Sequence, residues 1–318
     1  MTSATIAAKT CSSEQEAFLA ASLDGLSQSP KRLPGKYLWD EAGSILFDRI
    51  CDDPDYYPTR CEMALLPRVA QEIAGPIGPG ATIVEFGSGA SRKIRVLLEA
   101  LARPARYIAI DISEEYLEAS LDRLRPDYPD VAMEAVCADY SQPVRLPMEL
   151  AGETILGFFP GTSIGNFGPD DARAFLARAK DILGPSHFLI GADTTRDEER
   201  LTRAYGECGG LMGAFHLNLL ARMNRELDAE IALDGFRHEV KILPDPFRVE
   251  AHLVSLRDQT WTLGGKTISF AAGESVRTDT SHKYDPDTFG ALAAQAGWHL
   301  EQSWIDTFGF GLYLLRAE

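Results

Sequence analysis

Between residues 82 and 195 the chain alternates short apolar runs with longer amphipathic segments. The apolar runs are rich in β-branched and aromatic residues, as buried strands are, and the amphipathic segments follow the helical repeat. Alternation of this kind predicts a mostly parallel sheet with helices on both faces. The predicted strands centre on 82–87, 106–111, 131–137, 153–159 and 186–192, and the predicted helices on 91–103, 114–124 and 170–183.

A different pattern begins after residue 195. A long helical region is predicted over 197–227, and the dipeptide Gly264-Gly265 between two β-rich runs predicts a two-residue hairpin. Because strands now follow one another without intervening helices, we expect an inserted lobe of mixed α and β structure. Its predicted strands lie at 240–243, 247–256, 260–263 and 266–270.

The C-terminal segment returns to the first pattern. A helix is predicted at 286–296, and two strand-like runs follow at 298–305 and 308–316. The short connection between these two strands requires them to be antiparallel. A parallel sheet completed by an antiparallel strand is characteristic of S-adenosylmethionine-dependent methyltransferases and not of dehydrogenases.

Residues 1–60 form a predicted N-terminal arm, in which a helix at 14–26 precedes an irregular, aromatic-rich passage. Aromatic side chains in such a passage most often pack the arm against the rest of the protein. The alternative is that the turn at Tyr56 presents a phenol to a pocket. A helix at 61–74 and a breaker at 75–80 then precede the first strand. We therefore divide the chain into a core, 61–195 and 282–318, and a lobe, 1–60 and 196–281.

The segment Glu85-Phe-Gly87-Ser-Gly89 lies between the first predicted strand and a helix. In an open parallel sheet this turn lies at the carboxyl edge, where ligands bind, and glycine permits close approach of the backbone. A dinucleotide fingerprint would have a third glycine where Arg92 stands. Glu85 is unfavourable beside a diphosphate but favourable beside a cationic amino-acid moiety. The pattern therefore favours S-adenosylmethionine over NAD as the ligand.

Two later strands also end in groups that suit this ligand. Asp111 ends the second strand, 22 residues after Gly89, where a doubly wound fold places the carboxylate that binds both ribose hydroxyls. Asp139 and Tyr140 end the third strand and suit an adenine amino group and an adenine ring face. The alternative for Asp111 is a helix cap. Three consecutive strands with such ends favour a shared cofactor site over three separate caps.

The fourth strand leads into the loop Gly161-Thr-Ser-Ile-Gly165-Asn166. At the same edge of the sheet, this loop would border the reacting methyl group. Its glycines permit close approach, and Asn166 offers both hydrogen-bond donors and acceptors. The alternative for Asn166 is a turn or cap residue before the helix that starts near Pro169.

Composition limits the partners. The formal charge of −16 and the pI near 4.8 predict that neither a nucleic acid nor an acidic membrane is a partner. No apolar run is long enough to span a bilayer, and no signal-peptide region is evident. Five cysteines without a Cys-x-x-Cys pair predict a reducing, cytoplasmic location. Six scattered histidines without ligand spacing predict that no metal is bound.

Six segments carry a resemblance to known proteins: 55–60, 85–93, 161–166, 214–227, 270–274 and 281–284. Taken in order, they resemble one family: the L-histidine Nα-methyltransferases of ergothioneine biosynthesis. The resemblance runs from about Leu33 onward over the rest of the chain. It implies a Rossmann-like class I methyltransferase core of the α/β class, with a mostly parallel sheet and an antiparallel terminal strand, plus an α+β substrate-binding lobe. It also implies three methyl transfers from S-adenosylmethionine to the α-amine of histidine, giving hercynine.

The resemblance further implies roles for individual residues. Asn166 and Tyr205 are expected to fix the amino-acid end of the substrate, with Gly161 beside them, and Tyr56 to form a pocket wall near the amine. Asp279 and Ser281 fall where the family binds the imidazole. The expected cofactor site comprises Glu85, Gly87, Gly89, Lys93, Asp111, Asp139 and Tyr140.

Three positions depart from the family pattern. Asp279 stands in place of a glutamate, Ala251 in place of a methionine, and Trp39 in place of a tyrosine that is sometimes present. The first two changes would enlarge the side-chain pocket, and a shifted acid changes which substrates leave polar groups unpaired. Histidine is therefore the first expected substrate, with another aromatic amino acid, tryptophan or tyrosine, as the alternative. A non-catalytic, S-adenosylmethionine-binding regulator is a third reading, and the chain is expected to be a monomer. No residue is assigned as general base.

Overall fold

The computed structural model describes residues 3–89, 92–146, 150 and 152–318. The chain divides into two compact units, each built from two segments. The first unit is Met1–Asp55 with Glu198–Thr280, and the second is Tyr56–Asp197 with Ser281–Glu318. In this division the first boundary falls before Tyr56, because helix α3 (Tyr57–Ile77) starts there and belongs wholly to the second unit.

The second unit contains a seven-stranded sheet in the order β12-β13-β6-β5-β2-β3-β4. Strands β4, β3, β2, β5 and β6 are parallel to one another, whereas β13 is antiparallel to both β6 and β12. The predicted fold class is therefore confirmed, including the antiparallel terminal strand. The strands are β2 (Thr82–Phe86), β3 (Arg106–Asp111), β4 (Ala132–Cys137), β5 (Ile155–Phe159), β6 (Ser186–Asp193), β12 (His299–Ile305) and β13 (Phe310–Ala317).

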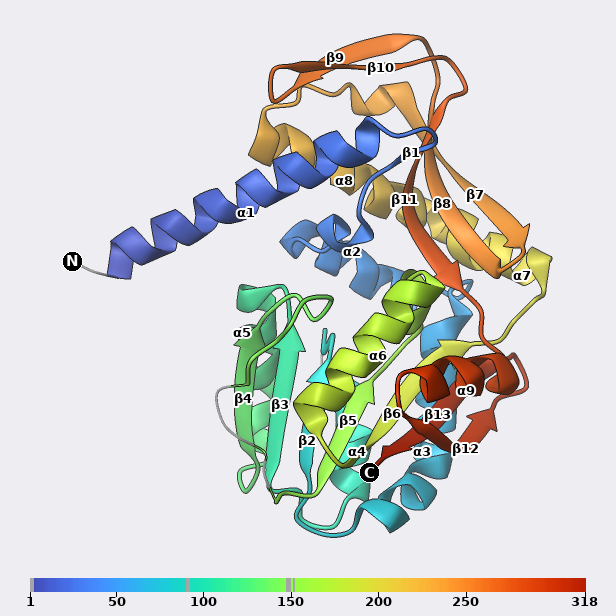
Figure 1. Ribbon diagram of the computed structural model, residues 1–318. Coiled ribbons are helices and arrows are strands. Elements are labelled where there is room, and N and C mark those ends of the chain that lie inside the picture. The colour runs from blue at the N-terminus through green and yellow to red at the C-terminus, as the bar shows by residue number, and fades with distance from the viewer. Residues whose placement is uncertain (1–2, 90–91, 147–149, 151) are drawn as a thin grey trace. The chain divides into compact units, whose positions relative to one another are not determined.

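Helices cover both faces of this sheet. In Figure 1, α6 and α9 lie in front of the strands, and α3 and α4 lie behind them. The helix predicted at 91–103 is shorter than expected and ends at Ala100, because Pro104 disfavours helical geometry just before it and Arg103 takes a φ of 52°. The remaining helices of this unit are α4 (Ile94–Ala100), α5 (Glu114–Leu124), α6 (Pro169–Leu183) and α9 (Pro286–Gln295).

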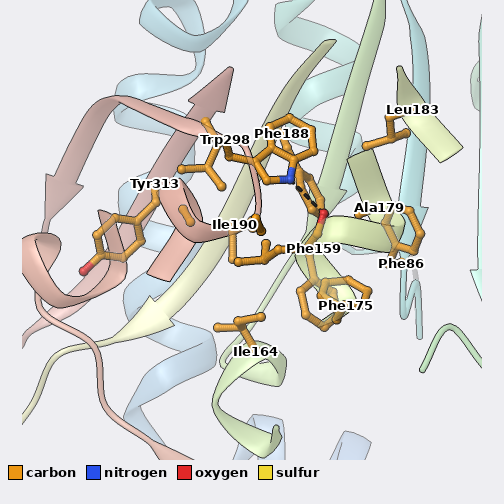
Figure 2. Close-up of a cluster of buried hydrophobic side chains, with 14 of the residues drawn as sticks. Phe86, Phe159, Ile164, Phe175, Ala179, Leu183, Phe188, Ile190, Trp298 and Tyr313 are labelled. Carbon is orange, nitrogen blue, oxygen red and sulfur yellow. Dashed lines mark hydrogen bonds between the residues drawn. The ribbon is translucent and has the colours of Figure 1, made fainter. Parts of the chain in front are cut away.

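An aromatic core fixes α6 on the sheet, as Figure 2 shows. The rings of Phe159 and Phe175 lie 4.6 Å apart, and those of Phe188 and Trp298 lie 5.4 Å apart. The Trp298 indole, almost completely buried, donates a hydrogen bond of 2.8 Å from Nε1 to the Leu176 carbonyl oxygen on α6. Buried aromatic side chains supply large apolar areas, and their polar atoms need such partners. The loop between β5 and α6 is thereby held at both of its ends.

The first unit has a four-stranded sheet in the order β1-β11-β8-β7, against which helix α8 packs (Figure 1). A separate hairpin, β9–β10, turns through Gly264 and Gly265 with φ values of 54° and 77°, so the predicted two-residue turn is confirmed. The elements are α1 (Ser3–Leu26), β1 (Lys31–Arg32), α2 (Glu41–Asp52), α7 (Glu198–Thr202), α8 (Leu211–Leu227), β7 (Phe236–Pro244), β8 (Phe247–Ser255), β9 (Gln259–Leu263), β10 (Lys266–Phe270) and β11 (Ser275–His282).

Two predictions for this unit are wrong. The aromatic-rich passage is not irregular throughout, because it contains helix α2, whose N-cap Asp40 accepts a hydrogen bond of 2.7 Å from the Gly43 backbone N–H. The helical region 197–227 is not continuous, because Cys208, Gly209 and Gly210 all have positive φ and separate α7 from α8. Strand β11 was not predicted, since its buried positions include Thr278 and Ser281, which do not read as apolar.

Among the helices of the described residues, none is both long and apolar enough to cross a membrane.

Candidate active site

The glycine turn after β2 is held by the neighbouring strand. Gly87 and Gly89 have φ values of 72° and 50°, which residues with a side chain rarely adopt. The Gly87 backbone N–H donates to the Ile110 carbonyl oxygen at 2.8 Å, and the Gly89 N–H donates to Oδ2 of Asp111 at 3.1 Å. The Ser120 hydroxyl donates to the Gly89 carbonyl oxygen at 3.0 Å. The turn is therefore tied to the end of β3 before any ligand binds.

Asp111 is part of this turn and is not the cap of helix α5. Its Oδ1 accepts from the Ser113 backbone N–H at 3.2 Å, and α5 begins after Ser113, whose side chain makes no cap hydrogen bond. Burial raises the pKa of the Asp111 carboxyl, and its backbone hydrogen bonds, led by the one from Gly89, oppose that effect. A carboxylate has about four acceptor sites, and the backbone hydrogen bonds from Gly89, Ser113 and Ile112 do not use all of them. The geometry suits a carboxylate that accepts from two hydroxyl groups of a ribose.

The end of β4 reaches the same turn. A side-chain carbon built on Gly87 would lie 3.4 Å from the Tyr140 ring, so the glycine leaves room beside that ring. Tyr140 packs against Phe159 at 5.5 Å between ring centroids, which orients it. Asp139 accepts from the backbone N–H and the hydroxyl of Ser141 at 2.9 and 2.5 Å. A ring, a carboxylate and a glycine surface thus lie together at this edge.

Glu85 differs from the other acids of this edge because its side chain is only 1% exposed. The Tyr107 hydroxyl donates to its Oε2 at 2.5 Å. Burial raises the pKa of the Glu85 carboxyl to about 8, although the Tyr107 hydrogen bond and the charge of Lys93 favour the ionised form. The carboxyl therefore lies behind the turn, among the charges of Glu62, Lys93 and Asp111.

We expect this carboxyl to make stability depend on pH. Its pKa is raised from 4.5 in the unfolded chain to about 8, so the folded state holds a proton that the unfolded state releases. The resulting stabilisation is complete below about pH 4.5 and is lost as the pH rises through about 8. Glu85→Gln keeps an acceptor for Tyr107 and removes the titration. Its melting temperature should match that of the wild type at pH 5 and exceed it at pH 9 by roughly 5 °C. If the variant and the wild type had the same melting temperature at pH 5 and also at pH 9, the raised pKa of Glu85 would be contradicted.

Lys93 and Gly161 share one buried partner, Glu62 on helix α3. The Lys93 ammonium lies 2.5 Å from Oε2 of Glu62, whose side chain is fully buried. The Gly161 backbone N–H donates to both carboxylate oxygens, at 2.9 and 3.0 Å. Glu62 was not predicted as a site residue. The available signal was its place on the otherwise apolar face of α3, with Leu65, Leu66 and Val69.

A second buried charge pair lies at the end of β6. The Lys283 ammonium and Oδ2 of Asp193 are 2.8 Å apart, both side chains are fully buried, and the Tyr57 hydroxyl donates to the same carboxylate. Lys283 also donates to the Ser281 hydroxyl at 3.0 Å. This network, which sequence reasoning missed, fixes the predicted Ser281 and the start of α3, where the buried Tyr56 stands.

Asn166 ends a short 3-10 helix, Ser163–Asn166, between β5 and α6. Asn166 is exposed to solvent. It does not cap helix α6, because the N-cap of that helix is Gly168. The loop is tightly placed because a side-chain carbon on Gly165 would lie 2.6 Å from the His282 carbonyl oxygen. The loop that starts at Gly161 thus holds an exposed amide at the carboxyl edge of the sheet.

Two predicted substrate residues belong to the first unit. Tyr205 lies in a π-helical turn, Arg203–Glu207, a form that is frequently found at functional sites. Asp279 lies on β11 beside Gly35, where a side-chain carbon would be 2.8 Å from its Oδ1. Trp39 packs its ring 4.8 Å from Phe47 and 5.3 Å from Phe215, so this arm residue contributes to a local aromatic cluster.

The carboxyl edge of the second unit fits an adenosyl ligand by its own geometry. The Ser88 hydroxyl in the glycine turn is buried without a hydrogen-bond partner, and Gly87 leaves space beside Tyr140. Within the described part of the chain, no group of three or more His, Cys, Asp or Glu residues is placed to hold a metal ion. The strand order and this edge define the class: an S-adenosylmethionine-dependent methyltransferase with a Rossmann-like fold.

Comparison with known proteins identifies the family. The model for "Histidine-specific methyltransferase, SAM-dependent" matches residues 18–317, so the chain belongs to that family. The histidine N-alpha-methyltransferase of Mycobacterium tuberculosis is 37% identical over 91% of this chain and 92% of its own length. Ergothioneine biosynthesis protein 1 of Neurospora crassa is 32% identical over 90% of this chain and 33% of its own. N-methyltransferase imqF of Aspergillus flavus is 30% identical, with coverages of 90% and 81%.

Proposed function

We propose that this chain transfers methyl groups from S-adenosylmethionine to the α-amine of L-histidine, giving hercynine in ergothioneine biosynthesis. The observation that carries the proposal is the 37% identity to a histidine N-alpha-methyltransferase over nearly the full length of both chains. The presence of Asp111 and Asn166 at the sheet edge supports a catalytic enzyme over a non-catalytic regulator.

The second unit supplies the groups that would hold the methyl donor. Asp111 would bind the ribose hydroxyls, Asp139 and Tyr140 the adenine, and Lys93 the carboxylate of the methionine portion. Gly87 and Gly89 would let the backbone approach this ligand closely. When bound, S-adenosylmethionine supplies an activated methyl group that an amine lone pair can accept by in-line displacement.

The chain's contribution to the reaction is orientation of the amine. An α-amine is mainly protonated near neutral pH, so a proton must leave before each transfer. Asn166, Tyr205 and Tyr56 would align the nitrogen, and excluding water from it would assist the transfer. We assign no general base among them. Three transfers also require that these groups tolerate a growing number of methyl groups on the nitrogen.

A second substrate class is favoured by the acid on β11. Asp279 is one methylene shorter than the glutamate expected there, and Ala251, only 7% exposed, replaces a larger residue. Asp279 and the hydroxyl of Ser281 would bind the imidazole of histidine. A shorter acid and a wider pocket would also suit another aromatic amino acid, tryptophan or tyrosine.

Incubation with methyl-labelled S-adenosylmethionine and a panel of amino acids separates these proposals. Label on histidine supports the first, and label on tryptophan or tyrosine alone supports the second. No label on any amino acid, from protein that binds S-adenosylhomocysteine, would contradict both and favour a non-catalytic role.

Asp279→Glu should strengthen histidine binding. The added methylene extends the carboxylate toward the imidazole and restores a direct charge-assisted hydrogen bond, so the KM for histidine should fall by about tenfold. The affinity for S-adenosylhomocysteine serves as the internal control and should not change. A higher KM for histidine in the variant would show that Asp279 does not contact the imidazole.

The remaining assignments concern partners and location. We propose that the protein acts as a monomer on a small amino-acid substrate, without nucleic-acid or membrane partners, in the cytoplasm. The charge of −16 supports the first exclusion. Five cysteines without a Cys-x-x-Cys pair support a reducing compartment.

A further inference from the structure

Glu62 is an acid in a place where helix α3 otherwise presents apolar residues to the sheet. Its side chain is fully buried, and a buried carboxylate is costly unless charges and hydrogen bonds compensate for the lost water. Packing alone would be served at lower cost by an apolar side chain of similar size. We therefore look for the function of Glu62 in the groups that its two carboxylate oxygens bind.

Those oxygens hold two different loops of the second unit. Oε2 pairs with Lys93, which directly precedes α4, and both oxygens accept from the Gly161 N–H in the loop after β5. The backbone around the carboxylate is shaped for it. A side-chain carbon on Gly191 of β6 would lie 3.0 Å from Oε1 of Glu62, and one on Gly161 would lie 3.4 Å from Nζ of Lys93.

An ammonium group has three donors, so the pair with Glu62 does not exhaust Lys93. The Lys93 side chain is 20% exposed, whereas that of Glu62 is not exposed at all. A lysine side chain with many accessible rotamers loses conformational entropy when it binds a ligand. A lysine that is already held by a buried carboxylate loses less.

We propose that Glu62 is a positioning residue for the methyl donor. By fixing Lys93 and the Gly161 backbone together, it sets the point at which the ammonium receives the carboxylate of the donor's methionine portion. It acts through Lys93 and does not touch the ligand. The nucleoside portion, held by Asp111, Asp139 and Tyr140, is bound independently of it.

Glu62→Gln tests this role with two ligands. S-adenosylhomocysteine carries the amino-acid carboxylate, and 5′-methylthioadenosine shares its nucleoside but lacks that group. The substitution keeps the shape of the side chain and removes its charge. By calorimetry, the variant should bind S-adenosylhomocysteine about tenfold more weakly than the wild type and 5′-methylthioadenosine with unchanged affinity.

Two further variants complete the design. Lys93→Gln should show the same selective loss, and Glu62→Gln combined with it should lose no more than Lys93→Gln alone, because the two residues act as one unit. Glu72→Gln, an exposed change on the same helix, should bind both ligands normally. Equal weakening of both ligands in Glu62→Gln would assign a merely structural role, and unchanged S-adenosylhomocysteine binding would also overturn the proposal.

Discussion

Asn166→Ala should lower kcat by about a hundredfold or more while leaving the affinity for S-adenosylhomocysteine unchanged. Asn166 stands exposed at the end of the 3-10 helix between β5 and α6, beyond the contacts that hold the glycine turn. Its amide would align the substrate nitrogen, and small losses of alignment are expensive in a direct displacement. Because the side chain does not hold the core together, the fold should be retained.

The measurement pairs steady-state kinetics on histidine with calorimetric titration of S-adenosylhomocysteine. Asp170→Ala provides the control, since its side chain is 92% exposed four residues further along the chain, and it should keep full activity. If Asn166→Ala turned over at the wild-type rate, the β5–α6 loop would not carry the group that orients the amine.

Asp111→Ala should weaken S-adenosylhomocysteine binding by about a hundredfold. The variant loses a carboxylate that would accept hydrogen bonds from two ribose hydroxyl groups. Hydrogen bonds to charged groups contribute about 1.5–3 kcal/mol each. The variant also releases the N–H groups of Gly89 and Ser113, so the glycine turn loses part of its support. Because the carboxylate would bind the ligand directly, the free energy of binding should change more than the free energy of unfolding.

Asp122→Ala on α5 is the matched control. Its carboxylate pairs with Arg125 on the surface, with a side chain that is 72% exposed, so its loss should affect neither binding nor stability appreciably. Wild-type affinity in Asp111→Ala would remove Asp111 from the cofactor site.

The centre of the parallel sheet was predictable because strands such as β2 and β5 are buried on both faces and appear as continuous apolar runs. Strand β2, for example, is buried at every position. The first unit was harder. Several buried positions of strand β11 hold polar residues, such as Thr278, whose hydroxyl is hydrogen-bonded to His216 Nδ1 at 2.9 Å. The sequence of β11 therefore shows no alternation of apolar and polar residues. The break before α8 depends on positive φ at three successive residues, of which Cys208 gives no local signal.

The candidate site shows the same division. The glycine turn, Asp111 and Tyr140 could be predicted because each follows or ends a strand whose carboxyl end lies at one edge of the sheet. In the structure, Gly89 is hydrogen-bonded to Asp111 and Gly87 lies beside Tyr140. Glu62 and Lys283 were missed because their roles depend on partners far away in sequence. The Glu62–Gly161 and Lys283–Asp193 contacts are set by tertiary packing within the second unit, which no local pattern specifies.

One titration tests the central claim most directly: S-adenosylhomocysteine added to the wild-type protein and to Asp111→Ala in a calorimeter. If the ends of β2, β3 and β4 hold the adenosyl group, the wild type should bind one equivalent with clear heat and the variant should bind far more weakly. No heat with the wild-type protein, or equal affinity in both, would contradict the account.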